Sequence, residues 1–556
     1  MKLSPFTFIC SGLIAVSLTL FPLRAGAASI PKHEDWQIAG PFGGTATALA
    51  VDPKNSNILL AGGMQSLLYQ SGDAGNSWSP LPLPKRTFGE VNAVLVDPRN
   101  PQHYLVGMGG SARAGLFDSA DGGMTWTVVP SLAGRSVSAL AVSASDPSTM
   151  VAGTRGGVFL SHDSGKTWVR ISDENDAELN GIDSVAIDPK NPQIIYVGTT
   201  HLPWKTVDGG KNWESIHNGM IDDSDVFSIF IDQRAPDRLS ASACSGIYAS
   251  ANRGGLWRKL MGIPNTHRRT HVIQEDPVSP GTIYAGTTLG LFRSENRGGD
   301  WRQLNEHQVN AIAFSSSPDG LFAALSGEGI VQSSDKGTTL KPKNTGFVAR
   351  RLGAYTVSGH RLVALEPQSG STTSIFISED KGETWQALHD VTGLEGIHLK
   401  SLIGFSDNEK LLFAANARQL FKSTDGGLSW KPDDLVATYW HKGMVQVRAA
   451  NGKYVTKAQN TEHKFRPYEI NDMLTEGTGR TTYIVAATDR GLLRSKDSGI
   501  HWALVDTGSV SGVLNIYASA KDDGRIVVEN GYRLFLTENF GESWKPLSWH
   551  RESILL

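Results

Sequence analysis

Residues 291–301 read LFRSENRGGDW: an apolar strand, then Ser-x-Asn-x-Gly, and a tryptophan three residues after the glycine. The same phrase, with Asp or Asn at its third position, recurs about every 45 residues along a chain of 556 residues. Eleven copies align, and their third residues are Asp73, Asp121, Asp163, Asp208, Asn252, Asn296, Asp335, Asp380, Asp425, Asp497 and Asn539. A phrase that recurs at a near-constant spacing predicts an array of similar structural units.

The phrase has the composition of a hairpin turn. The side-chain oxygen of its third residue can accept hydrogen bonds from backbone N–H groups, the glycine permits a positive φ, and the tryptophan covers the turn with a large apolar face. Three copies carry Asn at this position, and an amide cannot serve as a general acid. We therefore predict that these eleven residues are structural and that none of them is catalytic.

The step from Asp425 to Asp497 is too long for one unit. Inside it, residues 458–465 keep an asparagine, Asn460, and an aromatic residue, Phe465, in register after a strand-like run at 454–456. We interpret this stretch as a twelfth, decayed copy.

Each unit contains two further strand candidates before the phrase. Residues 184–187 and 194–197 are an example, and the segment between them begins with Asp188-Pro189, which favours a turn. The phrase itself joins a third strand to a fourth. Four short strands per unit with no helical periodicity predict an all-β protein, a β-propeller of about 11–12 four-stranded blades.

The grouping of the blades leaves several possibilities. The seven copies from Ser71 to Leu340 predict an N-terminal propeller at residues 28–345 with about seven blades, followed by a second propeller at 346–556 with about five. Two rings of equal size, or one large ring, are the alternatives. A strand around Trp36 precedes the first complete unit, and we expect it to complete a later blade and so close a ring.

The N-terminus has the pattern of a targeting segment. Lys2 precedes a largely apolar run at residues 6–23, and Ala25-Gly26-Ala27 provides small residues for signal-peptidase cleavage. We predict a signal peptide at residues 1–27 and a periplasmic or extracellular mature chain, with an uncleaved anchor as the alternative. No later apolar segment approaches the ~20 residues of a membrane span, so we expect none after cleavage.

Charge and motif content exclude several functions. A formal net charge of -3 provides no global basic field for nucleic acid or anionic lipid. The sequence has no cluster of Cys and His at metal-ligand spacing, no phosphate-binding glycine loop, and no HExxH or Gly-x-Ser-x-Gly motif. We therefore predict no nucleic-acid partner, no metal and no cofactor.

Residues 161–168, Ser-His-Asp-Ser-Gly-Lys-Thr-Trp, resemble the Asp-box or bacterial neuraminidase repeat. This repeat occurs in sialidases, xyloglucan-cleaving hydrolases, the sortilin ectodomain and propellers similar to the photosystem II stability and assembly factor. The resemblance covers nearly the whole mature chain and implies the fold, because these families share the turn and differ in function.

The motifs of the enzymes in this group are absent or altered. A sialidase would need an Arg-Ile/Leu-Pro motif near the start, where residues 35–42 read DWQIAGPF. The xyloglucan-cleaving hydrolases resemble this chain in the turn at residues 51–55. Their early Ala-Arg-Thr-Asp-type strand, which bears a catalytic Asp, corresponds here to LAGGMQ at residues 60–65. This departure argues against transferring the activity.

The loops between blades differ most in charge. Those at residues 171–181 and 216–225 are acidic, and the one at 263–271 is basic. We predict that Arg268, Arg269, Asp222 and Asp223 bind a partner at one ring mouth, because guanidinium groups can pair with carboxylates of a protein or an acidic sugar. Solvated surface loops are the alternative, and several acidic oxygens also suit Ca²⁺.

Two functions remain after these exclusions. We predict an exported, monomeric and non-enzymatic propeller that acts as a binding or assembly scaffold for a protein or glycan partner. The alternative is a glycoside hydrolase or lyase that acts on a polysaccharide through an unrecognised pair of carboxylates, since glycoside hydrolysis requires two of them.

Overall fold

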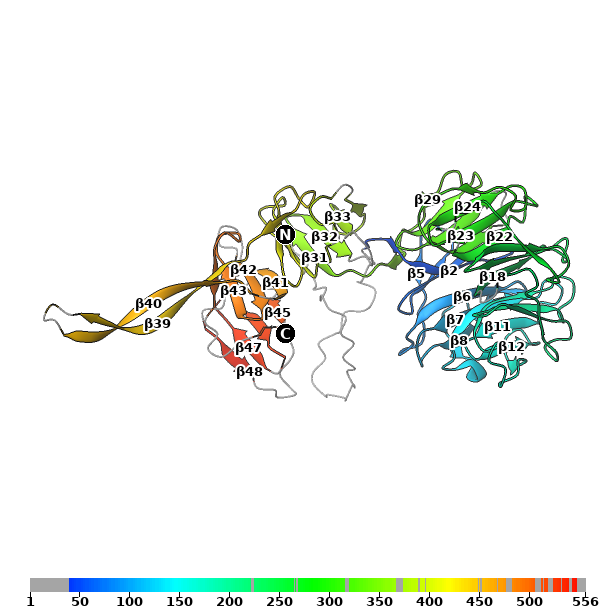
Figure 1. The fold of residues 1–556 in the computed structure, drawn as a ribbon, viewed down its shortest axis with the longest axis horizontal. Helices are drawn as coiled ribbons and strands as arrows, with labels where there is room; N and C mark the ends of the chain where they lie inside the picture. Colours follow the sequence, from blue (N-terminus) through cyan, green and yellow to red (C-terminus); the bar gives the residue numbers. More distant parts are fainter. Residues whose placement is uncertain are drawn as a thin grey trace, which may run out of the picture. The chain divides into compact units, whose positions relative to one another are not determined.

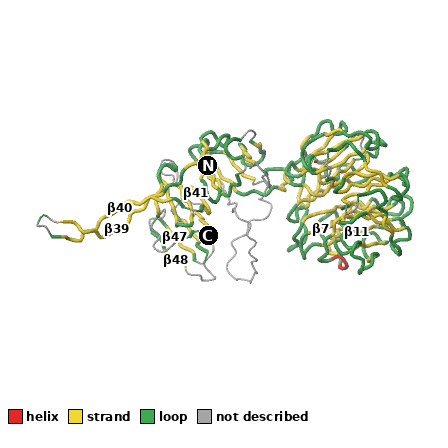
Figure 2. The backbone as a smooth tube through the Cα atoms, in the orientation of Figure 1, coloured by secondary structure: helices red, strands yellow, loops and turns green. Residues whose placement is uncertain are grey.

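The computed structural model describes residues 40–221, 225–264, 266, 269–315, 320–366, 374–388, 391–395, 397–448, 450, 453–467, 469–476, 483–505, 512–513, 515–518, 524–531, 533–539 and 543–547. The predicted signal peptide and the strand predicted around Trp36 lie outside these residues. In the described part of the chain, short β-strands and turns make up almost all of the structure, with one 3-10 helix at Pro130–Leu132 (Figure 2). The prediction of an all-β propeller protein is confirmed.

The chain divides into two compact units, Phe42–Arg350 and a second that includes Arg351–Leu556. We call the first the N-terminal ring and the second the C-terminal unit. Both are drawn in Figure 1, where blue to green marks the N-terminal ring. In the described part of the chain, no helix combines the length and the apolar character that crossing a lipid bilayer requires.

The N-terminal ring contains seven four-stranded antiparallel sheets, and each sheet is one blade. Blades 1 to 4 are β2 (Ala46–Val51), β3 (Leu59–Gly63), β4 (Leu68–Ser71), β5 (Ser79–Pro80); β6 (Glu90–Asp97), β7 (Asn100–Gly109), β8 (Gly115–Ser119), β9 (Thr127–Val128); β10 (Val137–Val142), β11 (Met150–Thr154), β12 (Gly157–Ser161), β13 (Val169–Arg170); β14 (Ile182–Ile187), β15 (Ile195–Thr199), β16 (Pro203–Thr206), β17 (Glu214–Ser215). Blades 5 to 7 are β18 (Val226–Ile231), β19 (Leu239–Ala243), β20 (Gly246–Ser250), β21 (Trp257–Lys259); β22 (Thr270–Glu275), β23 (Ile283–Thr287), β24 (Gly290–Ser294), β25 (Arg302–Gln303); β26 (Val309–Phe314), β27 (Leu321–Leu325), β28 (Gly329–Ser333), β29 (Lys341–Pro342).

The first strand of each blade packs against the first strand of the next, and β26 packs against β2. The ring therefore closes after seven blades. Each blade has four strands that are consecutive in the sequence, so no described strand is exchanged between the first and the last blade. Instead β1 (Gly43–Gly44) pairs in parallel with β30 (Val348–Ala349), and the side chain of Tyr69 donates a hydrogen bond to the carbonyl of Val348 at 2.7 Å.

The repeated phrase forms the turn between the third and fourth strands. In blade 3 the Ser161 hydroxyl donates to Asp163 at 2.8 Å and accepts the N–H of Gly165 at 2.8 Å. Asp163 also accepts the backbone N–H of Thr167 at 2.9 Å, and the indole N–H of Trp168 donates to the Gly165 carbonyl at 2.7 Å. Gly165 has a φ of +84°, which is why the phrase needs a glycine there.

The same hydrogen bonds recur in other copies. In the copy at Asn296, the amide oxygen accepts the N–H of Asp300 at 2.8 Å, so asparagine can perform this backbone role. Where the residue is a carboxylate, the bonds favour its ionised form. Hydrogen bonds from the side chain and backbone of Thr125 lower the pKa of Asp121 to about 2.

Replacing Asp163 by Ala is expected to destabilise the protein by about 1–3 kcal/mol, because the backbone N–H of Thr167 and the Ser161 hydroxyl lose their acceptor. Asp163→Asn is expected to be mild, since Asn252 and Asn296 occupy the equivalent position naturally. Chemical denaturation of the two variants and the unaltered chain measures both effects. Equal, large losses of stability in both variants would contradict the hydrogen-bond account.

The C-terminal unit contains four sheets among its described residues. Their strands are β31 (Ala354–Ser358), β32 (Arg361–Glu366), β33 (Ser374–Ser378), β34 (Gln386–Ala387); β35 (Ser401–Gly404), β36 (Leu412–Ala415), β37 (Leu420–Ser423), β38 (Lys431–Asp433); β39 (Ala437–Arg448), β40 (Tyr454–Phe465), β41 (Ile470–Glu476), β42 (Tyr483–Thr488), β43 (Gly491–Ser495), β44 (Trp502–Leu504); β45 (Asn515–Ala518), β46 (Ile526–Glu529), β47 (Leu534–Thr537), β48 (Lys545–Leu547).

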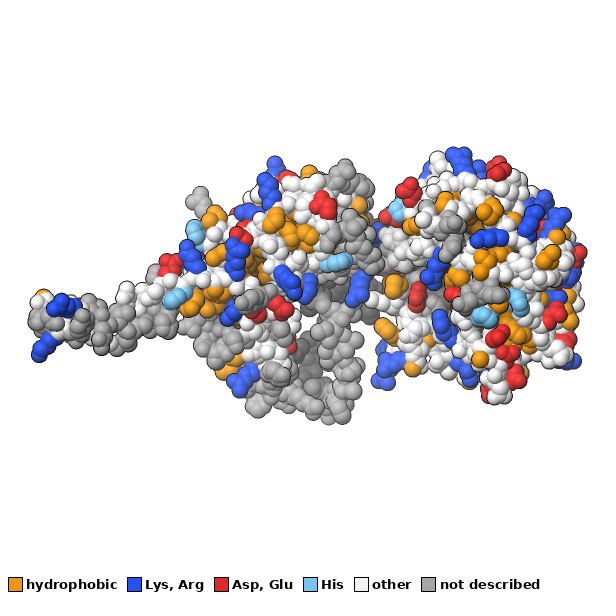
Figure 3. Space-filling view, in the orientation of Figure 1, with side chains coloured by type: hydrophobic (Ala, Val, Ile, Leu, Met, Phe, Trp, Pro, Cys, Tyr) orange, Lys and Arg blue, Asp and Glu red, His pale blue; other side chains and the backbone are white. Residues whose placement is uncertain are grey.

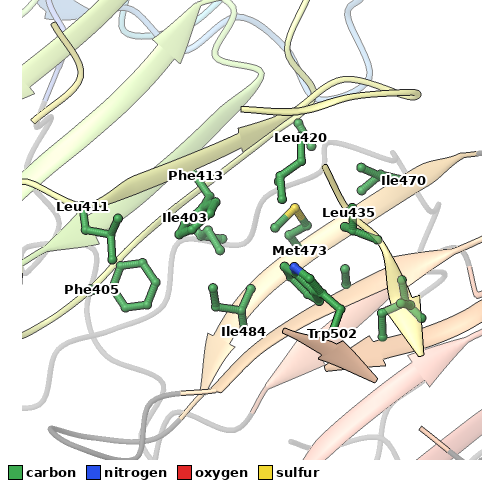
Figure 4. Packing of buried hydrophobic residues seen from close by; sticks show 14 residues of the cluster. Ile403, Phe405, Leu411, Phe413, Leu420, Leu435, Ile470, Met473, Ile484 and Trp502 are labelled. Atoms are coloured by element: carbon green, nitrogen blue, oxygen red, sulfur yellow. The ribbon is translucent and has the colours of Figure 1, made fainter. Parts of the chain in front are cut away.

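The tryptophan of the phrase also builds the core of this unit. Trp502, on β44, is 2% exposed and lies among side chains that include Phe413 of the preceding blade and Met473 of its own sheet (Figure 4). Phe405 and Phe413 meet edge to face with ring centroids 6.0 Å apart. A side chain that packs between neighbouring blades explains why the phrase recurs with its tryptophan.

The interpretation of residues 458–465 as a decayed copy is wrong. They lie in β40, which pairs with β39 over twelve positions to form a long hairpin (Figure 1). β39 pairs with the blade only through Ala437 and Thr438, opposite Trp502 and Ala503 of β44. The stretch is therefore extended strand throughout and contains no blade turn.

Candidate functional site

A β-bulge occurs at the same place in the first strand of all seven blades of the N-terminal ring. A bulge inserts one extra residue and redirects its side chain. The seven residues inserted in this way are Thr47, Asn92, Ser138, Asp183, Phe227, His271 and Asn310. All seven line one open cavity of about 1030 Å³, so each blade contributes one bulge residue to it.

In three blades the bulge side chain ties its blade to the next. The Thr47 hydroxyl donates to the carbonyl of Val91 at 2.6 Å, and the Asn92 amide donates to the carbonyl of Val137 at 3.0 Å. The Asn310 amide donates to the carbonyl of Ala46 at 2.8 Å, which links the last blade to the first. We call this contact the blade tether. Its purpose is structural, and it requires a donor at the bulge.

Blades 4, 5 and 6 depart from this pattern in succession, with Asp183, Phe227 and His271 at the bulge. The phenyl ring of Phe227 cannot donate to a carbonyl. In blade 4 the next residue takes over, since the Ser184 hydroxyl donates to the carbonyl of Val226 at 3.0 Å. In blade 5 Ser228 accepts the N–H of Ile273 at 3.4 Å. In these two blades a serine next to the bulge residue makes the contact with the next blade. Asp183 and Phe227 therefore do not need to make it.

Asp183 is the acidic group at this part of the cavity. Burial raises the pKa of its carboxyl, Arg155 and Arg269 oppose the rise, and the negative charge of Asp225 adds to it. Glu90 lines the same cavity, and burial raises its pKa as well. A carboxyl group that holds its proton more firmly than usual beside a second carboxylate is suited to general acid catalysis.

The basic side of the cavity is formed by blade 6. The Arg269 guanidinium lies over the Phe227 ring, 5.1 Å from its centroid, and the ring of His271 lies 6.1 Å from Phe227. Nε2 of His271 lies 3.2 Å from the Thr288 hydroxyl. Burial and the charge of Arg269 lower the pKa of His271, so its imidazole stays neutral over a wider pH range.

Of the binding residues predicted from the sequence, the structure describes Arg269, which lines the cavity together with Asp225 of the second acidic loop. Asp222, Asp223 and Arg268 lie outside the described residues, and their role stays a prediction. Sequence reasoning missed Asp183, Glu90 and Arg155. The signal for Asp183 was present: it directly follows the first residue of its blade's first strand pairing, where blades 1, 2, 3 and 7 place Thr, Asn or Ser.

The first acidic loop has a local explanation. Glu174 pairs with Arg170 at 2.9 Å, and Asn180 accepts a hydrogen bond from the same guanidinium at 2.8 Å. Across the residues that the structure describes, no group of three or more His, Cys, Asp or Glu side chains is placed to hold a metal ion. The Ca²⁺ alternative for the acidic loops therefore gains no support from them.

A second titratable cluster lies in blade 2, beside a cavity of about 410 Å³. The imidazole of His103 bridges two carboxylates, with Nδ1 3.1 Å from Asp97 and Nε2 3.2 Å from Asp118. The hydrogen bond to Asp118 raises the pKa of His103, burial opposes the rise, and Asp97 adds to it. These groups satisfy one another, and we assign the cluster to stability.

Replacing His103 by Gln is expected to lower the melting temperature more at about pH 6 than at about pH 9. The folded-state pKa of His103 is raised, so its stabilising contribution is complete below the ordinary value of 6.5 and is lost as the pH rises through the folded value. Thermal melts of both proteins across this pH range measure the difference. A difference that stays constant or grows with pH would contradict the assignment.

Known proteins resemble the chain in both sequence and fold. The chain is 27% identical over 293 residues to a probable oligoxyloglucan-reducing end-specific xyloglucanase of Neosartorya fischeri. The matched segment covers 47% of this chain and 36% of that protein. The chain thus matches about a third of the length of this curated relative. The structure of a GH74 xyloglucanase from Xanthomonas campestris gives a TM-score of 0.65 at 16% identity, covering 91% of this chain and 80% of the other. A GH74 enzyme of Niastella koreensis gives 0.56 at 17%, covering 91% and 85%.

These comparisons correct one prediction. The prediction of a non-enzymatic binding scaffold is wrong, because the curated relatives that the chain matches are named as xyloglucanases. They favour the alternative, a glycoside hydrolase of the Asp-box propeller type.

The resemblance to Asp-box propellers is confirmed. A family model described as "Photosynthesis system II assembly factor YCF48" matches residues 90–442, which is more than half of the sequence. The matched segment begins at the first strand of blade 2 and runs through the Asp-box turns up to Asp425. The chain belongs to the family of the photosynthesis system II assembly factor YCF48.

Proposed function

We propose that this protein is a glycoside hydrolase that cleaves a polysaccharide in the cavity lined by the seven bulge residues. The observation that carries the proposal is that Asp183 and Asp225 line the same cavity. Ser184, and not Asp183, makes the blade tether of blade 4. The charge of Asp225 contributes to the raised pKa of Asp183. The cavity that both residues line has a volume of about 1030 Å³. Kinship with xyloglucan-cleaving enzymes supports the same reaction class.

Glycoside hydrolysis needs one carboxyl group that protonates the leaving oxygen and a second that activates water or attacks the sugar. In our proposal Asp183 supplies the proton to the glycosidic oxygen as its bond to the anomeric carbon breaks. Asp225 acts on the opposite side of that carbon, either by taking a proton from the attacking water or as the nucleophile. Glu90 is the reserve candidate for this second role, because it lines the same cavity.

This chain has no acid at the strand where the xyloglucan-cleaving hydrolases bear a catalytic Asp, so any catalytic carboxylates must come from other positions. The corresponding segment includes β3, whose residues Leu59–Gly63 are all buried and contain no acid. The cavity instead presents hydroxyl and amide groups on several blades, which suit the hydroxyl groups of a sugar chain. Those groups include Thr45, Ser136, Thr200, Gln274 and Gln308.

The test is to incubate the purified chain with soluble xyloglucan and other plant and bacterial polysaccharides and to measure new reducing ends. A rise that depends on the protein, and that a variant with both Asp183→Asn and Asp225→Asn abolishes, supports the proposal. Full activity in this double variant moves the chemistry away from the cavity. Absence of cleavage across the whole panel removes the hydrolase assignment.

We also propose that residues 1–27 export the protein to the periplasm or the extracellular space. Lys2, the apolar run at residues 6–23 and Ala25-Gly26-Ala27 support this proposal. Sequencing the N-terminus of the exported protein is expected to give Ala28 or a residue beside it. An intact Met1 on membrane-bound protein would contradict cleavage.

A further inference from the structure

We infer that the polysaccharide recognised by this cavity is acidic, a polymer containing uronic acids, and that Arg155 and Arg269 bind its carboxylate groups. The inference rests on the proposed function, because it names the substrate class of the same site. It goes beyond the xyloglucan-cleaving relatives, since xyloglucan is a neutral polymer.

The backbones of both arginines are fixed by neighbouring segments. The N–H of Arg155, directly after β11, donates to the carbonyl of Ser136 at 3.0 Å. The carbonyl of Arg269, directly before β22, accepts the N–H of Thr288 at 3.0 Å. The stacking of Arg269 over Phe227 then limits the directions that its guanidinium can take. The ring thus positions the backbones of both residues and the guanidinium of Arg269 at the cavity.

Both guanidinium groups are exposed and line the cavity, and within the described residues neither forms an ion pair with a carboxylate. Some other arginines of the ring form ion pairs. Arg253 lies 2.7 Å from Asp188 and 2.6 Å from Asp237, and Arg170 lies 2.9 Å from Glu174. These two exposed guanidinium groups pair with no described carboxylate, and they line a cavity of about 1030 Å³. They are suited to bind carboxylates from outside, because a guanidinium can hold a carboxylate with two parallel hydrogen bonds.

The position of Asp183 connects this recognition to the chemistry. Both Arg155 and Arg269 act on the charge of its carboxyl group, so both lie within electrostatic reach of it. A uronate bound next to the scissile bond would place its carboxylate at the arginines while its glycosidic oxygen faces Asp183. The bound carboxylate would also offset the two positive charges, which otherwise favour the ionised form of Asp183, and so would help Asp183 to keep its proton.

The part of the surface outside the cavity that Figure 3 shows has no predominance of basic side chains. On the face shown in Figure 3, basic and acidic side chains are interspersed over the N-terminal ring, and the net charge of the whole chain is -3. A general attraction for polyanions is therefore weak. We therefore attribute the selection for an acidic polymer to Arg155 and Arg269, which gives the inference a sharp test.

The test compares three polyuronates, namely polygalacturonate, alginate and hyaluronate, each with its carboxyl-reduced neutral counterpart. Affinity electrophoresis of the full mature chain is expected to show at least about tenfold tighter binding to one polyuronate than to its reduced form, since hydrogen bonds to charged groups are worth about 1.5–3 kcal/mol. The preference is expected to weaken with added salt. Equal binding of the acidic and reduced forms of all three polymers would overturn the inference.

Variants of single arginines show which side chains produce the preference for the polyuronate over its carboxyl-reduced form. Arg155→Gln and Arg269→Gln are each expected to reduce the preference by about tenfold, whereas Arg302→Gln, an exposed arginine on the outer strand β25, is expected to leave it unchanged. A preference that survives both cavity variants would overturn the assignment. Cleavage of neutral polymers with no acid preference would remove the inference and leave the hydrolase standing. Arginine-dependent binding without any cleavage would support the inference and remove the hydrolase.

Discussion

Replacing Asp183 by Asn is expected to lower the rate of polysaccharide cleavage by about 10²–10⁴-fold and to leave the melting temperature nearly unchanged, because it removes a general acid from a site that is not needed for folding. Asparagine occupies the same bulge naturally at Asn92 and Asn310, so the backbone accepts it. The tether of this blade is made by Ser184 and is not disturbed. Reducing-end assays on the preferred polymer and thermal melts measure the two quantities.

The leaving group and the pH separate a general acid from a merely structural carboxyl group. An aryl glycoside with a strongly acidic phenol needs little protonation, so the variant is expected to keep most of its rate on that substrate. The pKa of Asp183 is raised, so the rate of the unaltered protein is expected to fall as the pH rises through that value, and the variant lacks this fall. Asp163→Asn, in an Asp-box turn, is the matched control. Equal losses on polymer and aryl glycoside would exclude the acid role.

The Asp-box turns were predictable because their chemistry is local. Serine, aspartate, glycine and tryptophan each make a contact within the turn or next to it, so the sequence alone shows them. The same chemistry explains the failure at residues 458–465. Ala458 stands where the turn needs the hydroxyl of a residue such as Ser161, and Glu462 stands where it needs a positive φ, as at Gly165. A strict requirement for these two positions would have rejected the copy.

The candidate site was less predictable because it depends on register. A bulge is defined by the pairing of two strands, so the sequence of a single strand such as Ile182–Ile187 does not by itself locate it. The charged loops were visible in the sequence, and Arg269 does line the cavity. The residues that share the cavity with Arg269 were not visible in the sequence. Asp183 belongs to blade 4 and Arg155 to blade 3, and they line the same cavity as Arg269 only in the closed ring.

Ring closure depends on a short segment after blade 7, and Phe347 is its main apolar contact. Phe347 is 0% exposed, and its ring lies 4.9 Å from that of Tyr69 and 6.0 Å from that of Trp78, both in blade 1. Its carbonyl accepts the N–H of Gly43 at 2.7 Å, beside the pairing of β1 with β30. The hydrogen bond from Tyr69 to the neighbouring Val348 joins residues 279 positions apart. Without these contacts the first and last blades would expose the apolar faces that now meet.

Replacing Phe347 by Ala is expected to destabilise the N-terminal ring by about 3–5 kcal/mol, because it removes a fully buried aromatic side chain and leaves a cavity at the seam. Phe88→Ala is the matched control, since Phe88 is 58% exposed and its loss should cost no more than about 0.5 kcal/mol. Calorimetry of the full chain measures the melting of each unit. Phe347→Ala should shift the transition of the N-terminal ring and leave that of the C-terminal unit in place. If both variants melt like the unaltered chain, closure does not depend on this contact, and the remaining links through β1, Tyr69 and Trp78 are sufficient to hold the seam.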